Sequence, residues 1–181
     1  PLAFAGILAF AVLTSVFLVL LGRRTSRYRK LAVERNTLLS QLGERIKELE
    51  CLYGVSRLLE DRTRSLEEAL PDIVELIPPS WQYPELAGAR IMFGNQQYAT
   101  SNFAETRWKQ SSEIVVFGKK IGAIEVSYLE EKPPADEGPF LAEERDLIDE
   151  MARQVGAVAE CRQAEKRIRA LSRFPAENPH P

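Results

Sequence analysis

The stretch that most constrains the fold is EIVVFGKKIGAIEVSY, residues 113–128. Two runs of β-branched and apolar residues flank Gly118-Lys119-Lys120, which predicts a β-hairpin with a glycine-assisted turn. Side chains alternate between the two faces of a strand, so the second arm has one large apolar face and one smaller, more polar face. The first face holds Ile124, Val126 and Tyr128, and the second holds Ala123, Glu125 and Ser127. We expect the first face to be buried and the second to be wet or covered by a helix.

Residues 1–22 form an uncharged apolar run, PLAFAGILAFAVLTSVFLVLLG. As an α-helix it would reach about 33 Å, enough to cross a hydrocarbon core of about 30 Å. A signal peptide fits less well, because the run is too long and lacks both a preceding basic region and a small-x-small cleavage site. A buried helix of a soluble protein usually carries a polar stripe, which is missing from this run. We therefore predict one transmembrane helix.

Basic residues follow this run directly, at Arg23, Arg24, Arg27, Arg29 and Lys30. An excess of Lys and Arg beside a span marks the cytoplasmic side, and such residues bind anionic lipid headgroups. Residues 31–181 contain 19 basic and 26 acidic residues, a net charge of −7. That balance argues against a nucleic-acid partner. We predict a protein of the inner (cell) membrane whose remaining domain is cytoplasmic.

A long helix is predicted over residues 31–59. Apolar residues recur along it at the three-four spacing of a coiled-coil seam. They are Leu39, Leu42, Ile46, Leu49 and Tyr53. Leu52, Val55 and Leu59 form a neighbouring stripe, so the second half has two apolar faces. A helix that packs on both a second copy and its own domain has this pattern, and the alternative is one wide core-facing stripe in a monomer. We favour the homodimer, because residues 27–42 have no domain of their own to cover.

A shorter helix should begin at Ser65, which offers an N-cap, with Glu67 and Glu68 in the first turn. Pro71 predicts a kink or a restart, and the pair at 78–79 should end the helix. Short strands are predicted at residues 89–93 and 97–100, joined by a Gly-Asn turn. The polar residues 101–112 and 130–138 are predicted as loops.

The last predicted helix spans about residues 141–171. Its first part offers a core-facing stripe of Leu147, Ile148, Met151, Val155 and Val158. Its second part keeps a narrower seam at a and d positions, made of Ala157, Cys161, Ala164, Ile168 and Leu171. This change is typical of a helix that leaves its domain as a two-helix coiled coil.

No catalytic constellation is evident in the sequence. Gly118-Lys119-Lys120 lacks the upstream glycine and the following Ser or Thr of a phosphate-binding loop. Two cysteines 110 residues apart and a lone histidine, His180, make neither a disulfide framework nor a transition-metal site. We therefore predict no enzyme activity, metal or cofactor within these residues.

Two pairs of residues leave alternatives open. Cys51 and Cys161 lie on helices that flank the central domain, so they are either a redox switch or attachment point, or small half-buried side chains. Trp81 and Trp108 either line a ligand pocket or belong to the core.

Several phrases together resemble the GAF domains of bacterial sensor histidine kinases. They are CLYGVS (51–56), PPSWQYP (78–84), ARI (89–91), WKQ (108–110), IGAIEV (121–126) and FLAEERDL (140–147). The resemblance covers about residues 44–171, and the tail FPAENP (174–179) is similar to the opening of a PAS domain. It implies an α+β fold, a GAF-like antiparallel sheet with flanking long helices, preceded here by one transmembrane helix and a coiled-coil linker.

The expected domain order follows from these assignments. Residues 1–22 form the transmembrane helix, 23–43 a basic juxtamembrane and coiled-coil linker, 44–172 the GAF-like domain with its last helix, and 173–181 the truncated start of a PAS-like domain. Both ends look cut, so we expect a fragment of a longer protein.

The resemblance implies a signal relay in a two-component system. The partners it implies are a second copy of the chain, the lipid bilayer, a downstream PAS and kinase region, and a response regulator. Some GAF relatives bind cyclic nucleotides, bilins or haem beneath a longer helical segment between the second and third strands. Only about a dozen polar residues, 101–112, occupy that place here. The alternative function is a GAF domain that itself binds a small-molecule or redox cofactor, such as haem or a nucleotide.

Overall fold

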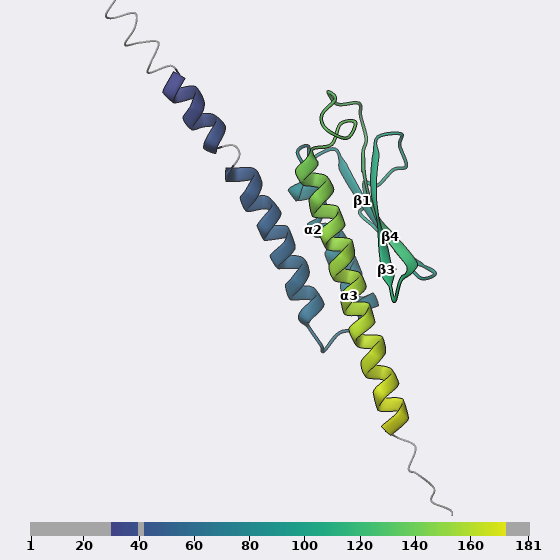
Figure 1. The fold of residues 1–181 in the computed structure, drawn as a ribbon. Coiled ribbons are helices and arrows are strands. Elements are labelled where there is room, and N and C mark those ends of the chain that lie inside the picture. Colours follow the sequence, from purple (N-terminus) through teal and green to yellow (C-terminus); the bar gives the residue numbers. More distant parts are fainter. Residues whose placement is uncertain (1–29, 40–41, 173–181) are drawn as a thin grey trace, which may run out of the picture. The chain divides into compact units, whose positions relative to one another are not determined.

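The computed structural model describes residues 30–39 and 42–172, which fall into two units that meet between Arg45 and Ile46 (Figure 1). In the first unit, residues 30–39 and 42–45 are helical. The predicted transmembrane helix at 1–22, the PAS-like segment at 173–181, and Arg23, Arg24, Arg27 and Arg29 lie outside the described residues. Within the described ranges, no helix combines the length and the apolar character that crossing a membrane requires.

The second unit has an α+β fold built on a four-stranded antiparallel sheet, as predicted. Its strands are β1 (Ala87–Phe93), β2 (Gln96–Ala99), β3 (Lys109–Val116) and β4 (Lys119–Tyr128), in the order β2-β1-β4-β3. The central position of β4 explains why residues 121–128 carry so many buried side chains.

The tip of the β3–β4 hairpin differs from the prediction. The turn is Phe117-Gly118, with φ angles of 49° and 73°, and both lysines belong to β4. A two-residue hairpin turn needs positive φ at both central positions, which a phenylalanine seldom supplies. Here the N–H of Phe117 donates to Glu160 Oε1 of the last helix, and the Arg167 guanidinium lies 5.5 Å from the centre of the Phe117 ring. These contacts with a distant element hold the turn.

The other strands differ from the prediction mainly at their ends. β1 begins two residues earlier than predicted, and β2 is shifted by one residue. The larger difference is that Lys109 to Ser112 belong to β3 although they are polar. Lys109 bonds to Glu125 and Gln110 bonds to Glu137, so partners far along the chain place these polar residues in a strand.

Three α-helices and a short 3-10 helix complete the described part of the second unit. Residues 42–60 are helical, and the part from Ile46 onward is named the leading helix. It is followed by α2 (Leu66–Leu76), the short 3-10 helix η1 (Pro78–Ser80) and α3 (Ala142–Ser172). Ser65 caps α2 as predicted, with a reciprocal bond from its own N–H to Glu68. The predicted restart at Pro71 does not occur, since α2 runs through it with Leu70, Ile73 and Val74 packed in the core.

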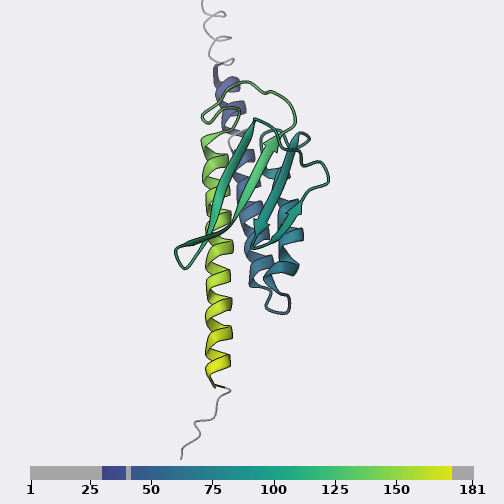
Figure 2. The same cartoon turned by 90° about the vertical axis from the view of Figure 1, so that its right-hand side faces the viewer.

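The helices cover one face of the sheet, named the inner face (Figure 2). α3 packs on β3, and α2 packs on β1 and β2. The leading helix lies against both α2 and α3, because Cys51 Sγ contacts Leu76 O at 3.5 Å and Met151 Sδ at 3.7 Å. The core between these layers includes Ile91, Ile124 and Val126 from the sheet.

The leading helix and α3 run side by side in the same direction (Figure 1). Their contacts advance together along both helices, from Cys51 with Met151 to Ser56 with Gln154, whose Oγ and Oε1 are 3.1 Å apart. Beyond the leading helix, Arg62 pairs with Glu165 at 3.0 Å. The chain therefore enters and leaves this unit along two parallel helices.

Candidate functional site: two parallel helices and a basic cavity

The opposite face of the sheet, named the outer face, is covered by residues 100–108, the covering segment. We expected this face to be wet or covered by a helix, and a non-helical segment covers it instead. A Cβ added at Gly88 would lie 2.7 Å from Phe103 Cα, so backbone lies almost directly on backbone. This contact leaves no room for a ligand between Gly88 and Phe103.

Hydrogen bonds hold the covering segment to β1 and β4. Ser127 Oγ donates to Ala104 O at 2.7 Å, and Thr106 Oγ1 donates to Tyr128 O at 2.9 Å. Asn102 Nδ2 donates to Ala87 O at 2.9 Å. The polar composition that predicted a loop thus provides the side chains that fasten it to the sheet.

A buried ion cluster lies under the same segment. Glu125 accepts hydrogen bonds from Arg90 Nε at 2.9 Å and from Lys109 Nζ at 3.2 Å, and Lys109 also reaches Glu105. Burial raises the pKa of Glu125, but the hydrogen bonds from Arg90 and Lys109 outweigh burial and leave the pKa below its usual value. The carboxylate therefore stays ionised and paired, which suits a structural role.

The two tryptophans have different surroundings. Trp81 is fully buried in the core, and its indole N–H finds no acceptor among the described residues. Trp108 is half-buried, with the Arg107 guanidinium 4.6 Å from the centre of its ring. Neither lines the basic cavity described below. Their assignment to a pocket stays a prediction, and the geometry around Trp81 is that of a core residue.

A buried carboxylate, Glu144, organises the start of α3. It accepts bonds from the N–H groups of Gln82 and Leu141, at 2.7 and 2.8 Å, and from the Tyr128 hydroxyl at 3.0 Å. Burial, followed by the nearby Glu144 charge, raises the pKa of Tyr128 far above its usual value. Tyr128 therefore remains a neutral donor, and Glu144 ties α3 to β4.

The cysteines are both free, and they occupy different environments. Cys51 is buried against Met151, and burial raises the pKa of its thiol. Cys161 is exposed and lies ten residues beyond Met151, or about 15 Å along the helix axis. The two thiols therefore cannot form a disulfide within one chain.

The predicted dimer residues of the second unit point away from its core. Ile46, Leu49 and Tyr53 are 47%, 65% and 70% exposed, while Cys51, Val55 and Leu59 on the other side of the leading helix are buried. On α3, Cys161, Ile168 and Leu171 are exposed. In the first unit, Leu39, Leu42 and the headgroup candidate Lys30 are also exposed. Dimerisation stays a prediction, and these residues are available for it.

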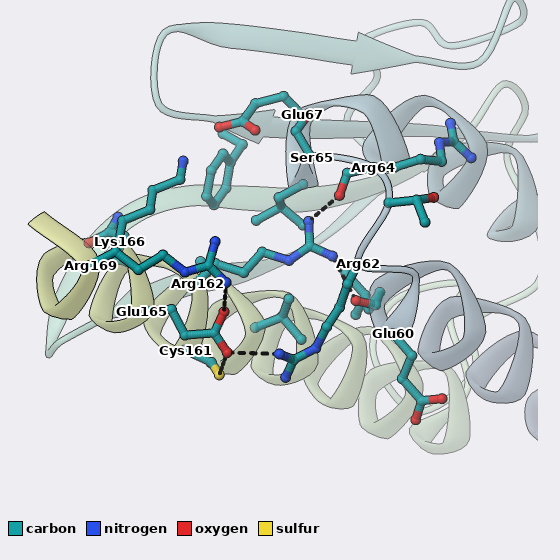
Figure 3. A pocket seen from close by; sticks show the side chains of 17 residues that line it. Glu60, Arg62, Arg64, Ser65, Glu67, Cys161, Arg162, Glu165, Lys166 and Arg169 are labelled. Carbon is teal, nitrogen blue, oxygen red and sulfur yellow. Dashed lines mark hydrogen bonds and ion pairs between the residues drawn. The ribbon is translucent and has the colours of Figure 1, made fainter.

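A cavity of about 520 Å³, named the basic cavity, lies where the leading helix ends (Figure 3). Its walls come from most residues between Leu59 and Glu67, from Phe93, and from one side of α3 between Val158 and Arg169. Arg162 lies in one wall and donates to three main-chain oxygens, those of Leu59, Asp61 and Arg64, at 2.8 to 3.1 Å. The guanidinium thereby satisfies the last carbonyls of the leading helix and fixes the turn at 61–65.

Sequence reasoning missed this cavity. The sequence pattern that could have predicted it is the spacing of Arg162, Lys166 and Arg169, which places three cations on one helix face. That face is the continuation of the core-facing stripe that ends at Val155 and Ala159.

No group of His, Cys, Asp and Glu side chains suitable for a metal occurs in the described ranges. Comparisons with protein-family models and with curated proteins find no match to the chain. The resemblance to GAF domains therefore stays a prediction.

Proposed function

We propose that residues 46–172 are the relay domain of a membrane-anchored sensor histidine kinase of the GAF type, acting as a homodimer. In this proposal the leading helix receives a displacement from the membrane side, and α3 passes it to a downstream PAS and kinase region. That kinase would transfer phosphate to a response regulator, and the relay domain itself performs no catalysis.

The observation that carries the proposal is the parallel packing of the leading helix and α3. Cys51–Met151, Ser56–Gln154 and Arg62–Glu165 are three successive contacts between the leading helix, with the turn that follows it, and α3. Because packed side chains rather than a flexible tether join the two helices, a shift of one helix changes the packing of the other. Packed interfaces of this kind switch between discrete arrangements instead of deforming smoothly.

The outward apolar residues support the dimer. They end at Tyr53 on the leading helix and resume at Ala157 on α3, and Ser56 bonds to Gln154 between these two points. The outward surface of the two helices therefore carries exposed apolar residues on the leading helix before this contact and on α3 after it. A second copy placed along this surface would contact both helices and would sense a shift of either one.

The covering segment gives further support, because a relay needs no ligand in its core. Contacts between Gly88 and Phe103 and between Ser127 and Ala104 close that part of the outer face. The alternative, a haem or nucleotide sensor, has less support from this geometry. Absorbance of the purified chain, and its melting temperature with haem and with nucleotides, test that alternative. A bound chromophore or a saturable rise in melting temperature would favour the sensor.

The homodimer is tested by the mass of the full 181-residue chain in a mild detergent, measured by sedimentation equilibrium. We expect a dimer at tens of micromolar. The substitution Ile168→Asp should shift the equilibrium toward monomer, because it places a charge in the apolar seam. Gln163→Asp is the matched control, since it adds the same charge to an exposed position on another side of α3. A strict monomer, or equal effects of both substitutions, contradicts the proposal.

Cys161 offers a direct probe of the interface. In a parallel dimer through α3, the two Cys161 thiols face each other across the symmetry axis. Mild oxidation of the full chain should therefore give a covalent dimer that Cys161→Ser abolishes and Cys51→Ser preserves, because Cys51 is buried. The reading frame beyond Pro181 tests the rest of the proposal, which expects PAS and kinase sequences there.

A further inference from the structure

The basic cavity has an excess of positive charge. Five cationic side chains contribute to its walls, Arg62, Arg64, Arg162, Lys166 and Arg169, and three carboxylates do so, Glu60, Glu67 and Glu165. Figure 3 shows Arg62 reaching from the 61–65 turn toward Glu165 and the three cations of α3, whereas the Arg64 side chain points away from them. A volume of about 520 Å³ falls within the range of small-molecule sites.

The carboxylates neutralise only part of this charge. Glu165 pairs with Arg62 at 3.0 Å and with Arg169 at 4.0 Å, both at the surface. Arg162 is half-buried, and its bonds go to main-chain oxygens, with no carboxylate in ion-pair contact among the described residues. Lys166 likewise has no ion-pair partner in the part of the chain that the structure describes.

Like charges at this spacing on one helix face repel one another, so their alignment does not serve the helix itself. Arg162 is explained by its three carbonyl acceptors, but Lys166 has no such partners among the described residues, and Arg169 has only its surface pair with Glu165. Both follow Arg162 on the same face of α3 and border the cavity. An anion seated there would relieve the repulsion and would contact both the turn and α3.

We propose that the basic cavity binds a small, multiply charged anion of the phosphate-ester or polyphosphate class. Lys166 and Arg169 bind the anion from α3, and Arg62 binds it from the turn, with the Arg162 charge behind them. Arg64 is not a ligand, because its guanidinium pairs with Asp72 at 2.7 Å and donates to Glu68 O. The occupied site ties the end of the leading helix to α3. Cys161 belongs both to the cavity wall and to the predicted dimer seam, but the cations that bind the anion do not belong to the seam. Binding therefore does not require the relay function or the dimer.

The test is isothermal titration of the full chain with inorganic pyrophosphate, in a buffer without phosphate and at fixed ionic strength. We expect saturable binding to one site per chain, weakened by added sodium chloride because the contacts are ionic. Lys166→Gln and Arg169→Gln should each weaken binding roughly fivefold, the upper value for a solvent-exposed ion pair. A dissociation constant above about 1 mM overturns the proposal.

Arg167→Gln is the matched control. It removes the same charge one residue from Lys166, but Arg167 lies beside Phe117 and does not line the cavity. Equal weakening by Arg167→Gln and Arg169→Gln would mean general charge attraction and would overturn the proposal. Lys166 and Arg167 are exposed, so neither substitution threatens the fold.

A second titration distinguishes free anions from lipid headgroups. Glycerophosphoglycerol carries a single phosphodiester charge and represents the headgroup of an anionic phospholipid. Tighter binding of pyrophosphate than of glycerophosphoglycerol supports a multiply charged soluble ligand. Tighter binding of glycerophosphoglycerol overturns that assignment in favour of a lipid headgroup. Neither outcome depends on whether the chain is a dimer in the sedimentation experiment, so the two proposals fail separately.

Discussion

On the inner face of the sheet, Ile91, Ile124 and Val126 are fully buried beneath the helix layer. On the outer face, Arg90, Glu125 and Ser127 occupy the neighbouring positions of the same strands. Arg90 bonds to Glu125, and Ser127 bonds to the covering segment. Both faces exclude water at the centre of the sheet. The inner face does so with apolar packing, and the outer face does so with directed polar bonds.

This difference has consequences for stability. Apolar packing is non-directional and depends on the volume filled, so it fails when atoms are removed. A buried polar face depends on complete pairing, so it fails when one partner is removed or changes its charge. The inner face should therefore respond to truncation and the outer face to pairing and pH.

The largest expected effect is on the inner face. Ile124→Ala removes a fully buried side chain and should lower the free energy of unfolding by about 4 kcal/mol. Chemical denaturation of the full chain in detergent measures it. Val115→Ala, at a half-exposed position of β3, is the control and should cost below about 1 kcal/mol. Equal losses at both positions would mean that the helix layer does not fill the inner face.

On the outer face, Glu125→Gln should cost about 3 kcal/mol at neutral pH. The amide keeps the shape of the side chain but leaves Arg90 and Lys109 without their buried counter-charge. Glu113→Gln is the matched control, because Glu113 pairs with Lys120 at the exposed hairpin and should contribute roughly 0.5 kcal/mol. If Glu125→Gln were no worse than its control, the outer face would not depend on ion pairing.

The stability difference between the wild-type protein and Glu125→Gln should also depend on pH. The pKa of Glu125 is lowered in the folded state, where hydrogen bonds from Arg90 and Lys109 outweigh burial. Its contribution is therefore complete above the unfolded pKa of about 4.3 and is lost as the pH falls through the lowered folded value. The difference in unfolding free energy between wild type and Glu125→Gln should be constant above about pH 5 and shrink below it. A difference that stayed constant in acid would contradict this assignment.

Gly88→Ala tests how closely the covering segment lies on the sheet. The new methyl group would be 2.7 Å from Phe103 Cα, so backbone must move, which should cost about 2 kcal/mol. Proteolysis within residues 100–108 should also become faster. Gly43→Ala, which meets no atom within 4 Å, is the control and should be neutral or slightly stabilising. A fully stable Gly88→Ala protein would show that the segment yields without loss.

The comparison of the two faces also explains what the sequence could predict. The strand at residues 121–128, the Ser65 cap and the long last helix depend on local patterns, and all three are found, although both faces of the strand are buried. The Phe117-Gly118 turn, the polar start of β3 and the covering segment depend on partners such as Glu160 and Glu125. Such long-range pairs leave no periodic signal in a single sequence.

Of the two candidate sites, local sequence patterns likewise predict one and not the other. The outward residues Leu49, Tyr53 and Ile168 were identified from spacing, because an exposed apolar seam is itself a periodic pattern. The basic cavity could not be identified from spacing, because Arg62 belongs to a turn and Lys166 to a helix 104 residues later. Only the fold places a turn against the end of the core-facing stripe.

The smallest effect tests a single polar bond of the outer face. Ser127→Ala removes the donor to Ala104 O and leaves that carbonyl without this partner, which should cost about 1 kcal/mol. Ser111→Ala is the control on the neighbouring strand, because Ser111 faces the same side of the sheet but is exposed. Hydrogen exchange at the amides of residues 101–107 should accelerate in Ser127→Ala alone. If global stability fell while that exchange stayed unchanged, the Ser127 bond would stabilise the sheet rather than the covering segment.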